Sequence, residues 1–238
     1  MTSNAADWTF VFVGNVDPAV LKPLVEKYIA SLPGDTKTAV TKVDAYNPAL
    51  FMAGGSKTDT FTTPMSTPQT YVAIIESGDM DFTPKNSMLA SIVGQILTNR
   101  LIKTVREEMG AVYSISAAGQ LDRTGLRPAS IMSSFPMKPE MKDEVLPFIQ
   151  QQFKEMESNV TAEELNPIKE YMVKVFTENR EKNPAWRQAI LANLTNGVDT
   201  FNGNVDVMNS ITIQDVMDYM KALNAQNNYR VVILDPAK

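Results

Sequence analysis

The chain has 238 residues, with 22 lysines and arginines, 27 aspartates and glutamates, and a formal net charge of −5. A hydrophobic fraction of 44% is ordinary for a globular protein, and this length allows one large or two modest domains. No basic cluster stands out, which argues against nucleic acid or an anionic membrane surface as a partner. No apolar stretch approaches the ~20 residues that cross a bilayer, and the first ten residues lack the features of a signal peptide.

Histidine and cysteine are both absent, which restricts the chemistry that the chain supports. Nearly all common zinc sites include one of these residues, and nucleophilic triads need a histidine base. Adjacent acidic pairs such as Glu107 and Glu108 diverge on a helix, so they are solvated charges rather than acid–base pairs. We therefore expect no metal site, no cofactor and no catalytic residue in this chain.

The first 34 residues predict a strand followed by a helix. Residues 8–13 are apolar, aromatic or β-branched, which is typical of a buried strand. Asp17 and Pro18 then supply an N-cap and a first helical residue, and an apolar helical stripe follows. Residues 35–56 are polar with few apolar pairs, which is typical of a linker.

Beyond this linker, short strands are expected at residues 58–63 and 69–76, with a turn after the second. Thr83 and Pro84 then mark the start of a long helix with apolar residues at helical spacing. We expect this helix to kink near residues 98–99.

The remaining chain predicts a hairpin, a helical block and a closing strand. Residues 112–121 and 129–135 read as two strands separated by a polar turn. From Pro139 the pattern is helical, and a last strand is expected at 229–234. Helix starts are marked by Thr161 with Glu164, Asn183 with Pro184, and Thr212 with Asp215. This order predicts an α+β fold, a mostly antiparallel sheet with helices packed on one face.

The run NRLIKTVREEMGAVYSI, residues 99–115, joins the long helix to the strand after it. Gly110 is the residue type that accepts the left-handed backbone closing a helix. Arg106 is expected in the last helical turn and Tyr113 early in the strand, and both side chains donate hydrogen bonds to carbonyls or oxyanions. The structural alternatives are that Arg106 complements the helix dipole and that Tyr113 points at the core.

Within that run, RLIKTVREEMGAVYS resembles a motif in the C-terminal half of the M16 (insulinase/pitrilysin-type) zinc metallopeptidases. The stretch FVFVGNVDPAVLKPLVEKYIASLPG and the closing run VVILDP are similar to further parts of that family. The resemblance implies that residues 1–34 are the β–α tail of a preceding M16-like domain and 57–238 the C-terminal M16-like domain, with 35–56 as linker. The chain is then expected to be a piece of a longer polypeptide.

In that family, two like halves enclose a peptide chamber, and the N-terminal half binds zinc through an H-x-x-E-H element that this sequence lacks. The resemblance implies that Arg106 and Tyr113 bind substrate and stabilise the developing oxyanion. Asn99, where relatives often have serine, departs from the family pattern.

We therefore expect the zinc-free half of an M16 zinc metallopeptidase, inactive alone. Its partners are the zinc-bearing half, in the same polypeptide or in a partner subunit, and a peptide substrate. The alternative is a non-catalytic peptide-binding or scaffold module with the M16 fold. Neither nucleic acid nor membrane insertion is expected, and the resemblance favours the bacterial periplasm or cell envelope.

Overall fold

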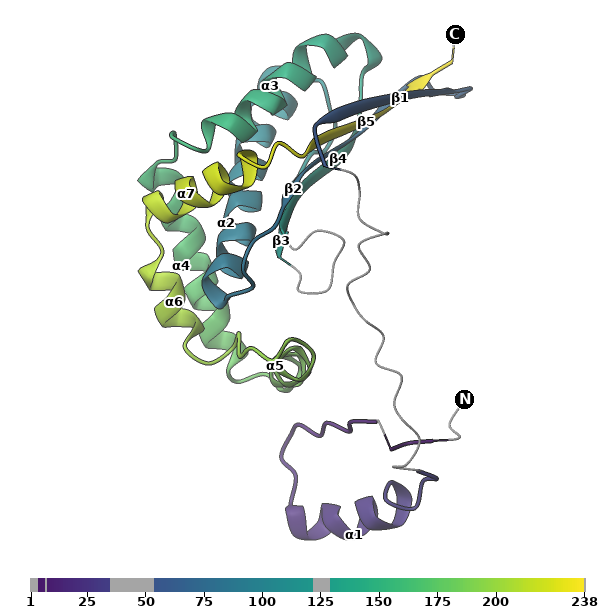
Figure 1. The fold of residues 1–238 in the computed structure, drawn as a ribbon, viewed down its shortest axis with the longest axis vertical. Helices are drawn as coiled ribbons and strands as arrows, with labels where there is room; N and C mark the ends of the chain where they lie inside the picture. The colour runs from purple at the N-terminus through teal and green to yellow at the C-terminus, as the bar shows by residue number, and fades with distance from the viewer. Residues whose placement is uncertain (1–3, 7, 35–53, 122–128, 238) are drawn as a thin grey trace. The chain divides into compact units, whose positions relative to one another are not determined.

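Figure 1 shows the fold in a computed structural model that describes residues 4–6, 8–34, 54–121 and 129–237. Two predicted segments lie outside the described residues. They are residues 35–53 of the expected linker and the polar turn of the expected hairpin. The chain divides into two compact units, one from residues 1–45 and 175–202, the other from residues 46–174 and 203–238. The larger unit contains the sheet and the motif.

The larger unit is built on a five-stranded sheet with the order β1-β5-β2-β4-β3. Its strands are β1 (Lys57–Thr63), β2 (Thr70–Gly78), β3 (Ala117–Leu121), β4 (Ala129–Met137) and β5 (Tyr229–Pro236). β1 runs parallel to β5, and the other neighbouring strands are antiparallel. Helices cover one face of the sheet (Figure 1), so the predicted α+β class with a mostly antiparallel sheet is confirmed.

Several kinds of helix form the layer over the sheet. They are α2 (Pro84–Leu101), a π-helix (Ile102–Glu108), a 3-10 turn (Pro139–Met141), α3 (Lys142–Glu155), the first part of α4 (Ala162–Asn179), α6 (Asn204–Ser210) and α7 (Ile213–Asn224). α6 has no counterpart in the sequence prediction, because 7 residues are too few to show a helical period. Among the described residues, no helix has the length and apolar character needed to span a bilayer.

The core lies between the sheet and this helical layer. Its fully buried side chains include Ile74 and Ile131 from the sheet, Ile92, Ile96 and Leu97 from α2, Ile149 and Phe153 from α3, and Met220 from α7. The apolar stripe predicted for the long helix therefore packs against the sheet, as expected for a one-sided helical layer.

The predicted caps at Thr83, Thr161 and Thr212 form as hydrogen bonds, whereas the helix that starts at Asn183 has no side-chain cap. Thr161 Oγ1 accepts from the Glu164 N–H at 3.3 Å, and a Glu164 carboxylate oxygen accepts from the Thr161 N–H at 3.0 Å. Thr212 and Asp215 form the same capping box before α7, and Thr83 caps α2. These local signals were sufficient because each cap needs only residues three positions apart.

The smaller unit contains α1 (Pro18–Tyr28), the end of α4, and α5 (Asn183–Asn196). Asp17 caps α1 as predicted, accepting from the Ala19 N–H at 2.8 Å. The strand predicted at residues 8–13 is wrong, since these residues pair with no other strand in the described chain. An extended segment without a hydrogen-bonded neighbour does not form a stable strand, however apolar its sequence.

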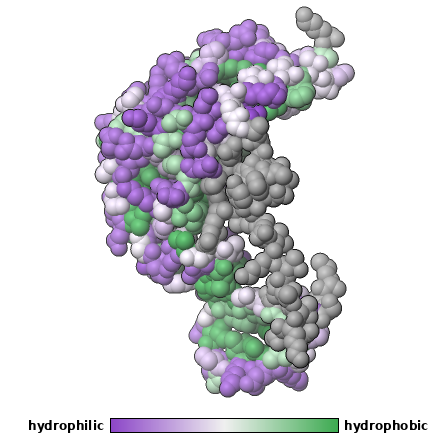
Figure 2. Space-filling model, viewed as in Figure 1, coloured by the Kyte–Doolittle hydropathy of each residue, from purple (hydrophilic) through white to green (hydrophobic). Residues whose placement is uncertain are grey.

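Many apolar side chains in the first 34 residues are exposed, including Trp8, Phe12, Val20 and Leu24. Figure 2 shows this segment with a broad hydrophobic surface, drawn in green. The visible surface of the helical layer in the larger unit is mostly hydrophilic in the same view. The larger unit therefore has the ordinary distribution, with apolar side chains inside and polar side chains on the surface. The first 34 residues do not have this distribution.

Candidate functional site

The motif is positioned by a close backbone contact between α2 and β3. A Cβ atom on Gly119 would overlap the carbonyl oxygen of Ala90, and one on Gly94 would overlap the backbone nitrogen of Gly119. Only glycine allows the helix and the strand to approach this closely. The contact holds the middle of α2 at a fixed distance from the sheet.

Thr98 fastens the end of α2 to the start of β3. Its Oγ1 accepts a hydrogen bond from the Ala117 N–H at 2.8 Å and lies 2.9 Å from the Ala117 carbonyl oxygen. The segment 99–116 is therefore held at both ends by one side chain.

Arg100, the first arginine of the motif, holds α2 against the start of α4. Its Nε donates to Glu164 Oε1 at 2.6 Å and its Nη2 to Glu164 Oε2 at 3.0 Å, and Nη2 also donates to the Asn159 carbonyl oxygen. Burial favours the neutral form of Glu164, but hydrogen bonds from Arg100 and Thr161 and the charge of Arg100 lower its pKa overall. The two parallel N–H···O bonds make this motif residue a structural anchor.

After Leu101 the α-helix continues as the π-helix, and this change of helix type lies close to where the sequence predicted a kink. The Ala111 N–H donates to the Val105 carbonyl oxygen at 3.1 Å, which closes the wide last turn. Gly110 has a φ of +61°, so its predicted role in closing the helix is confirmed.

Arg106 and Tyr113 both project from the surface around this closure. Arg106 lies in the last π-helical turn and is exposed, with no hydrogen bond or ion pair to its side chain in the described part of the chain. Tyr113 is 90% exposed, while its neighbours Val112 and Ile115 are buried. The alternative in which Tyr113 points at the core is therefore excluded.

The predicted strand at 112–121 is too long, because β3 starts at Ala117 and Tyr113 lies at a bend before it. Two single hydrogen bonds, from Ser133 in β4 and from Lys138 directly after β4, hold this segment in place of strand pairing. The Lys138 N–H donates to the Ala111 carbonyl oxygen at 3.1 Å, and Ser133 Oγ donates to the Ser116 carbonyl oxygen at 2.7 Å.

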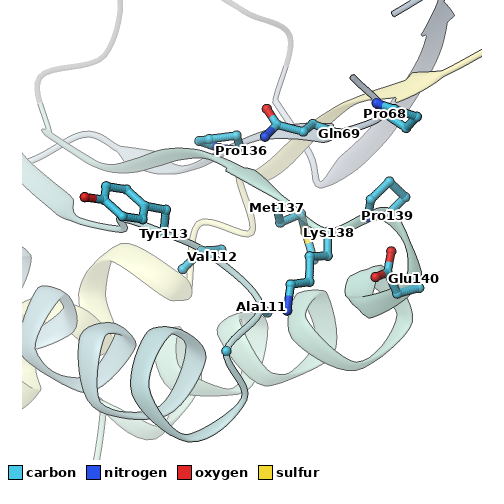
Figure 3. A pocket seen from close by; sticks show the side chains of 11 residues that line it. Pro68, Gln69, Ala111, Val112, Tyr113, Pro136, Met137, Lys138, Pro139 and Glu140 are labelled. Carbon is cyan, nitrogen blue, oxygen red and sulfur yellow. The ribbon is translucent and has the colours of Figure 1, made fainter. Parts of the chain in front are cut away.

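Tyr113 lines a pocket of about 440 Å³ between the bend, the residues before β2 and the end of β4. In Figure 3, Tyr113 lies at one end of this pocket and Glu140 at the other, and the side chain of Lys138 lies between them and extends toward Ala111. Gln69 lines it from the segment before β2, whereas Arg106 is not among its lining residues. The structure thus brings only one of the two predicted site residues to the pocket.

The pocket combines a phenol, an amide, an ammonium and a carboxylate with backbone groups, a set suited to hydrogen-bonding a peptide. Sequence reasoning missed Gln69, Lys138 and Glu140, because only the sheet topology brings the start of β2 and the end of β4 beside the motif. Across the described residues, no group of three or more acidic, histidine or cysteine side chains could hold a metal ion.

Known proteins share both the sequence pattern and the fold. Residues 4–172 match the family model described as the peptidase M16 inactive domain. No curated protein matches the chain.

Solved structures share the fold at low sequence identity. A mutant of the ferredoxin protease FusC, in complex with Arabidopsis ferredoxin, is 18% identical with a TM-score of 0.75, over 94% of this chain and 24% of that chain. The periplasmic protease PqqL from Escherichia coli is 18% identical with a TM-score of 0.76, and the match covers 94% of this chain and 25% of PqqL. A peptidase M16 inactive domain from Pseudomonas fluorescens is 17% identical with a TM-score of 0.66, over 94% and 53%. The chain thus spans about a quarter of FusC and PqqL.

Proposed function

This chain belongs to the family of M16 peptidase inactive domains, and from this premise we propose that it is the zinc-free, substrate-contacting half of an M16 zinc metallopeptidase. It is a non-catalytic M16 domain with an α+β fold. The proposal adds that this domain contributes one wall of a peptide chamber and that peptide hydrolysis needs a second, zinc-bearing half.

Tyr113 is the observation that carries the proposal. Its phenol is 90% exposed at the rim of a pocket, on a bend fixed by buried neighbours on either side. Exposing a tyrosine to this extent leaves its aromatic surface in water, which a purely structural role does not require. The hydroxyl is available to donate to a substrate carbonyl or to the oxyanion that forms from it.

Arg106 has a different place in the proposal. It lies outside the pocket lining but is exposed, and no described residue holds its side chain. A free guanidinium on a long side chain reaches several ångströms from its helix, so we propose that it contacts the same bound peptide from beside the pocket. The H-x-x-E-H half, in the same polypeptide or in a partner subunit, supplies the zinc that activates water.

The exposed apolar surface of residues 1–34 supports the proposed division of the chain. An apolar patch of this kind is normally covered by other protein surface. We propose that residues 1–34 are the tail of a preceding M16-like domain, that residues 35–56 form a linker, and that residues 57–238 form the C-terminal domain.

Mixing this chain with its zinc-bearing half and measuring cleavage of a fluorogenic peptide tests the proposal. The mixture is expected to cleave the peptide, and neither half alone. Arg106→Ala and Tyr113→Phe should each lower kcat/KM by about tenfold or more, as expected for lost transition-state donors.

Two matched variants control for changes in charge and in aromatic hydroxyl content. Lys103→Ala removes one positive charge from the same π-helix, and Tyr171→Phe removes the hydroxyl of another exposed tyrosine. Both should leave kcat/KM within about twofold, because surface groups remote from the site contribute little. If the mixture keeps full activity with Arg106→Ala and with Tyr113→Phe, then neither residue has the role in substrate binding proposed for it.

The chemistry of the pocket favours a second candidate, a peptide-binding module without a catalytic role. The donors and acceptors that line the pocket can hydrogen-bond a peptide without any catalytic step. Arg106 is not one of the residues that line this pocket. In that case the isolated chain binds peptides, Tyr113→Phe weakens binding, and Arg106→Ala has no effect on binding or on cleavage by the mixture.

A further inference from the structure

A second pocket, at the opposite end of β2, contains a buried carboxylate without a complete set of hydrogen bonds. Glu76 near the end of β2 is only 3% exposed, and its Oε1 has no hydrogen-bond partner in the described structure. Glu76 lines a pocket of about 330 Å³ with residues from α3, from the end of α7 and from the start of β5. A buried carboxylate oxygen without a partner is costly, so a ligand donor that reached this oxygen from the pocket would remove that cost.

A hydrogen-bond network fixes the walls of this pocket. Asn224 Nδ2 donates to the Phe153 carbonyl oxygen at 2.9 Å and to Glu157 Oε1 at 2.7 Å, which joins the ends of α7 and α3. Ser56 Oγ donates to Asn227 Oδ1 at 2.8 Å, which ties the turn before β5 to the segment before β1. The pocket is therefore held by the fold itself.

The charges around the pocket favour a cation. Glu76 and Glu157 both line it, and α3 and α7 end beside it, each placing the negative end of its dipole there. Lys154, the one cation among the lining residues that the structure describes, is exposed and forms no ion pair there with either carboxylate. An anion would meet two negative side chains and two helix C-termini.

Neutralisation of Glu76 by a proton does not complete its hydrogen bonds. Burial, reinforced by the charge of Glu157 and opposed by a backbone hydrogen bond from Asn228, raises the pKa of Glu76 to about 7. A protonated Oε1 would need an acceptor instead of a donor, so one unsatisfied atom would replace another. The hydroxyl of Tyr229, also on the pocket wall, is likewise buried without a partner in the described structure.

A metal ion suits these residues less well than an organic cation. No described cluster of three or more acidic, histidine or cysteine side chains is present to coordinate a metal. Two carboxylates with amide and phenol groups match the several N–H donors of an ammonium or guanidinium group. The volume of about 330 Å³ also accommodates such a group with part of its aliphatic stem.

We propose that this pocket binds a cationic nitrogen group, an ammonium or guanidinium, through Glu76, Glu157 and Tyr229. The group is carried by a lysine or arginine side chain or by an amino terminus. This site is separate from the pocket at Tyr113 and does not depend on the role proposed for that pocket.

The test is a titration of the full-length ¹⁵N-labelled chain at pH 7.5, followed by amide chemical shifts. The probes are Nα-acetyl-lysine methylamide, Nα-acetyl-arginine methylamide and alanine methylamide, with neutral Nα-acetyl-norleucine methylamide as control. At least one cationic probe should give saturable shifts at Glu76, Asn224 and Tyr229, and the neutral probe none. The tightest cationic probe identifies which of the three sources the pocket prefers.

Glu76→Gln should weaken binding of that probe by about tenfold or more, as expected for loss of a charge-assisted bond. Glu144→Gln, which removes the same charge from an exposed position on α3 outside the pocket, should leave the affinity within about twofold. Tyr229→Phe, which keeps the ring and its contacts, provides a second variant if Glu76→Gln does not fold, and it should weaken binding about threefold.

Four results would overturn the proposal. They are the absence of saturable shifts at the highest soluble concentration of every cationic probe, equal binding of the norleucine probe, unchanged affinity in the folded pocket variants, and the same shifts on addition of calcium chloride alone.

Discussion

Two glycines on either side of Tyr113 have opposite surroundings. Gly119 in β3 lies so close to α2 that a Cβ atom would overlap the backbone of Ala90. Gly110, at the end of the π-helix, has no atom within 4 Å of the position of a Cβ atom and has a φ of +61°. Glycine is required at the first position by space and at the second by backbone conformation.

The two glycines mark two parts of this region, the tightly packed contact between α2 and β3 and the exposed segment that follows the π-helix. On the Gly119 side, α2 and the sheet are in backbone contact and Thr98 closes the helix–strand connection. On the Gly110 side, the chain turns into solvent and presents Arg106 and Tyr113. A rigid base that supports an exposed group is the arrangement that keeps a binding residue in place without burying it.

Gly119→Ala is expected to give the largest loss of stability, at least about 3 kcal/mol, because backbone rather than a flexible side chain occupies the space. Urea unfolding followed by circular dichroism measures this loss. Gly54→Ala is the matched control, since its Cβ would make only an ordinary contact at 3.5 Å with Asn228 Oδ1. A loss below about 1 kcal/mol for Gly119→Ala would contradict the close α2–β3 contact.

Arg100→Met is expected to cost about 2 kcal/mol, because Glu164 and the Asn159 carbonyl oxygen lose their donor in a partly buried place. The pKa of Glu164 is lowered in the folded protein, so its ion pair stabilises above pH 4.5, the ordinary value, and this stabilisation is lost as pH falls below it. The difference between variant and wild type in urea unfolding should therefore shrink as the pH is lowered from neutral to well below that value.

A double variant with Glu164→Gln isolates this interaction. The two changes together should cost less than the sum of the single changes, since each removes the same ion pair. Equal pH dependence of the single variant and wild type would assign the role of Arg100 to its aliphatic packing alone.

The sequence predicted the parts of this fold that depend on near neighbours. The caps at Thr83, Thr161 and Thr212 use partners three residues away, and β2 and β5 are short runs with a strong strand composition. The left-handed closure at Gly110 is likewise a property of one residue. In each case, the determining feature lies within one residue or a few neighbouring residues of the chain.

The sequence could not predict features that depend on distant segments. The bend at Tyr113 has the alternation of a strand, but residues 111–116 form only single hydrogen bonds with Ser133 and Lys138, and pairing with β4 begins at Ala117. Glu76 looks like the polar end of a strand, but it is buried, and residues distant in sequence from α3, α7 and β5 surround the pocket beside it. Residues 8–13 have strand composition, but no neighbouring strand in the described chain pairs with them.

The smallest expected effect is the difference in stability between alanine and asparagine substitutions, and its sign should differ between Gly110 and Gly119. Gly110→Ala should cost about 1 kcal/mol, the penalty for a left-handed backbone at a residue with a Cβ atom. Gly110→Asn should cost less than Gly110→Ala, because asparagine tolerates this conformation and open space surrounds the position. At Gly119 the order should reverse, with asparagine worse than alanine, since the larger side chain meets the same backbone obstacle.

Urea unfolding curves of these four variants settle this order. If asparagine lowers the free energy of unfolding less than alanine at both positions, then glycine is required at position 119 for its backbone conformation as well. Asparagine more costly at both would mean that the segment around Gly110 is packed, and Tyr113 would then lie on a surface that is covered rather than open to a peptide.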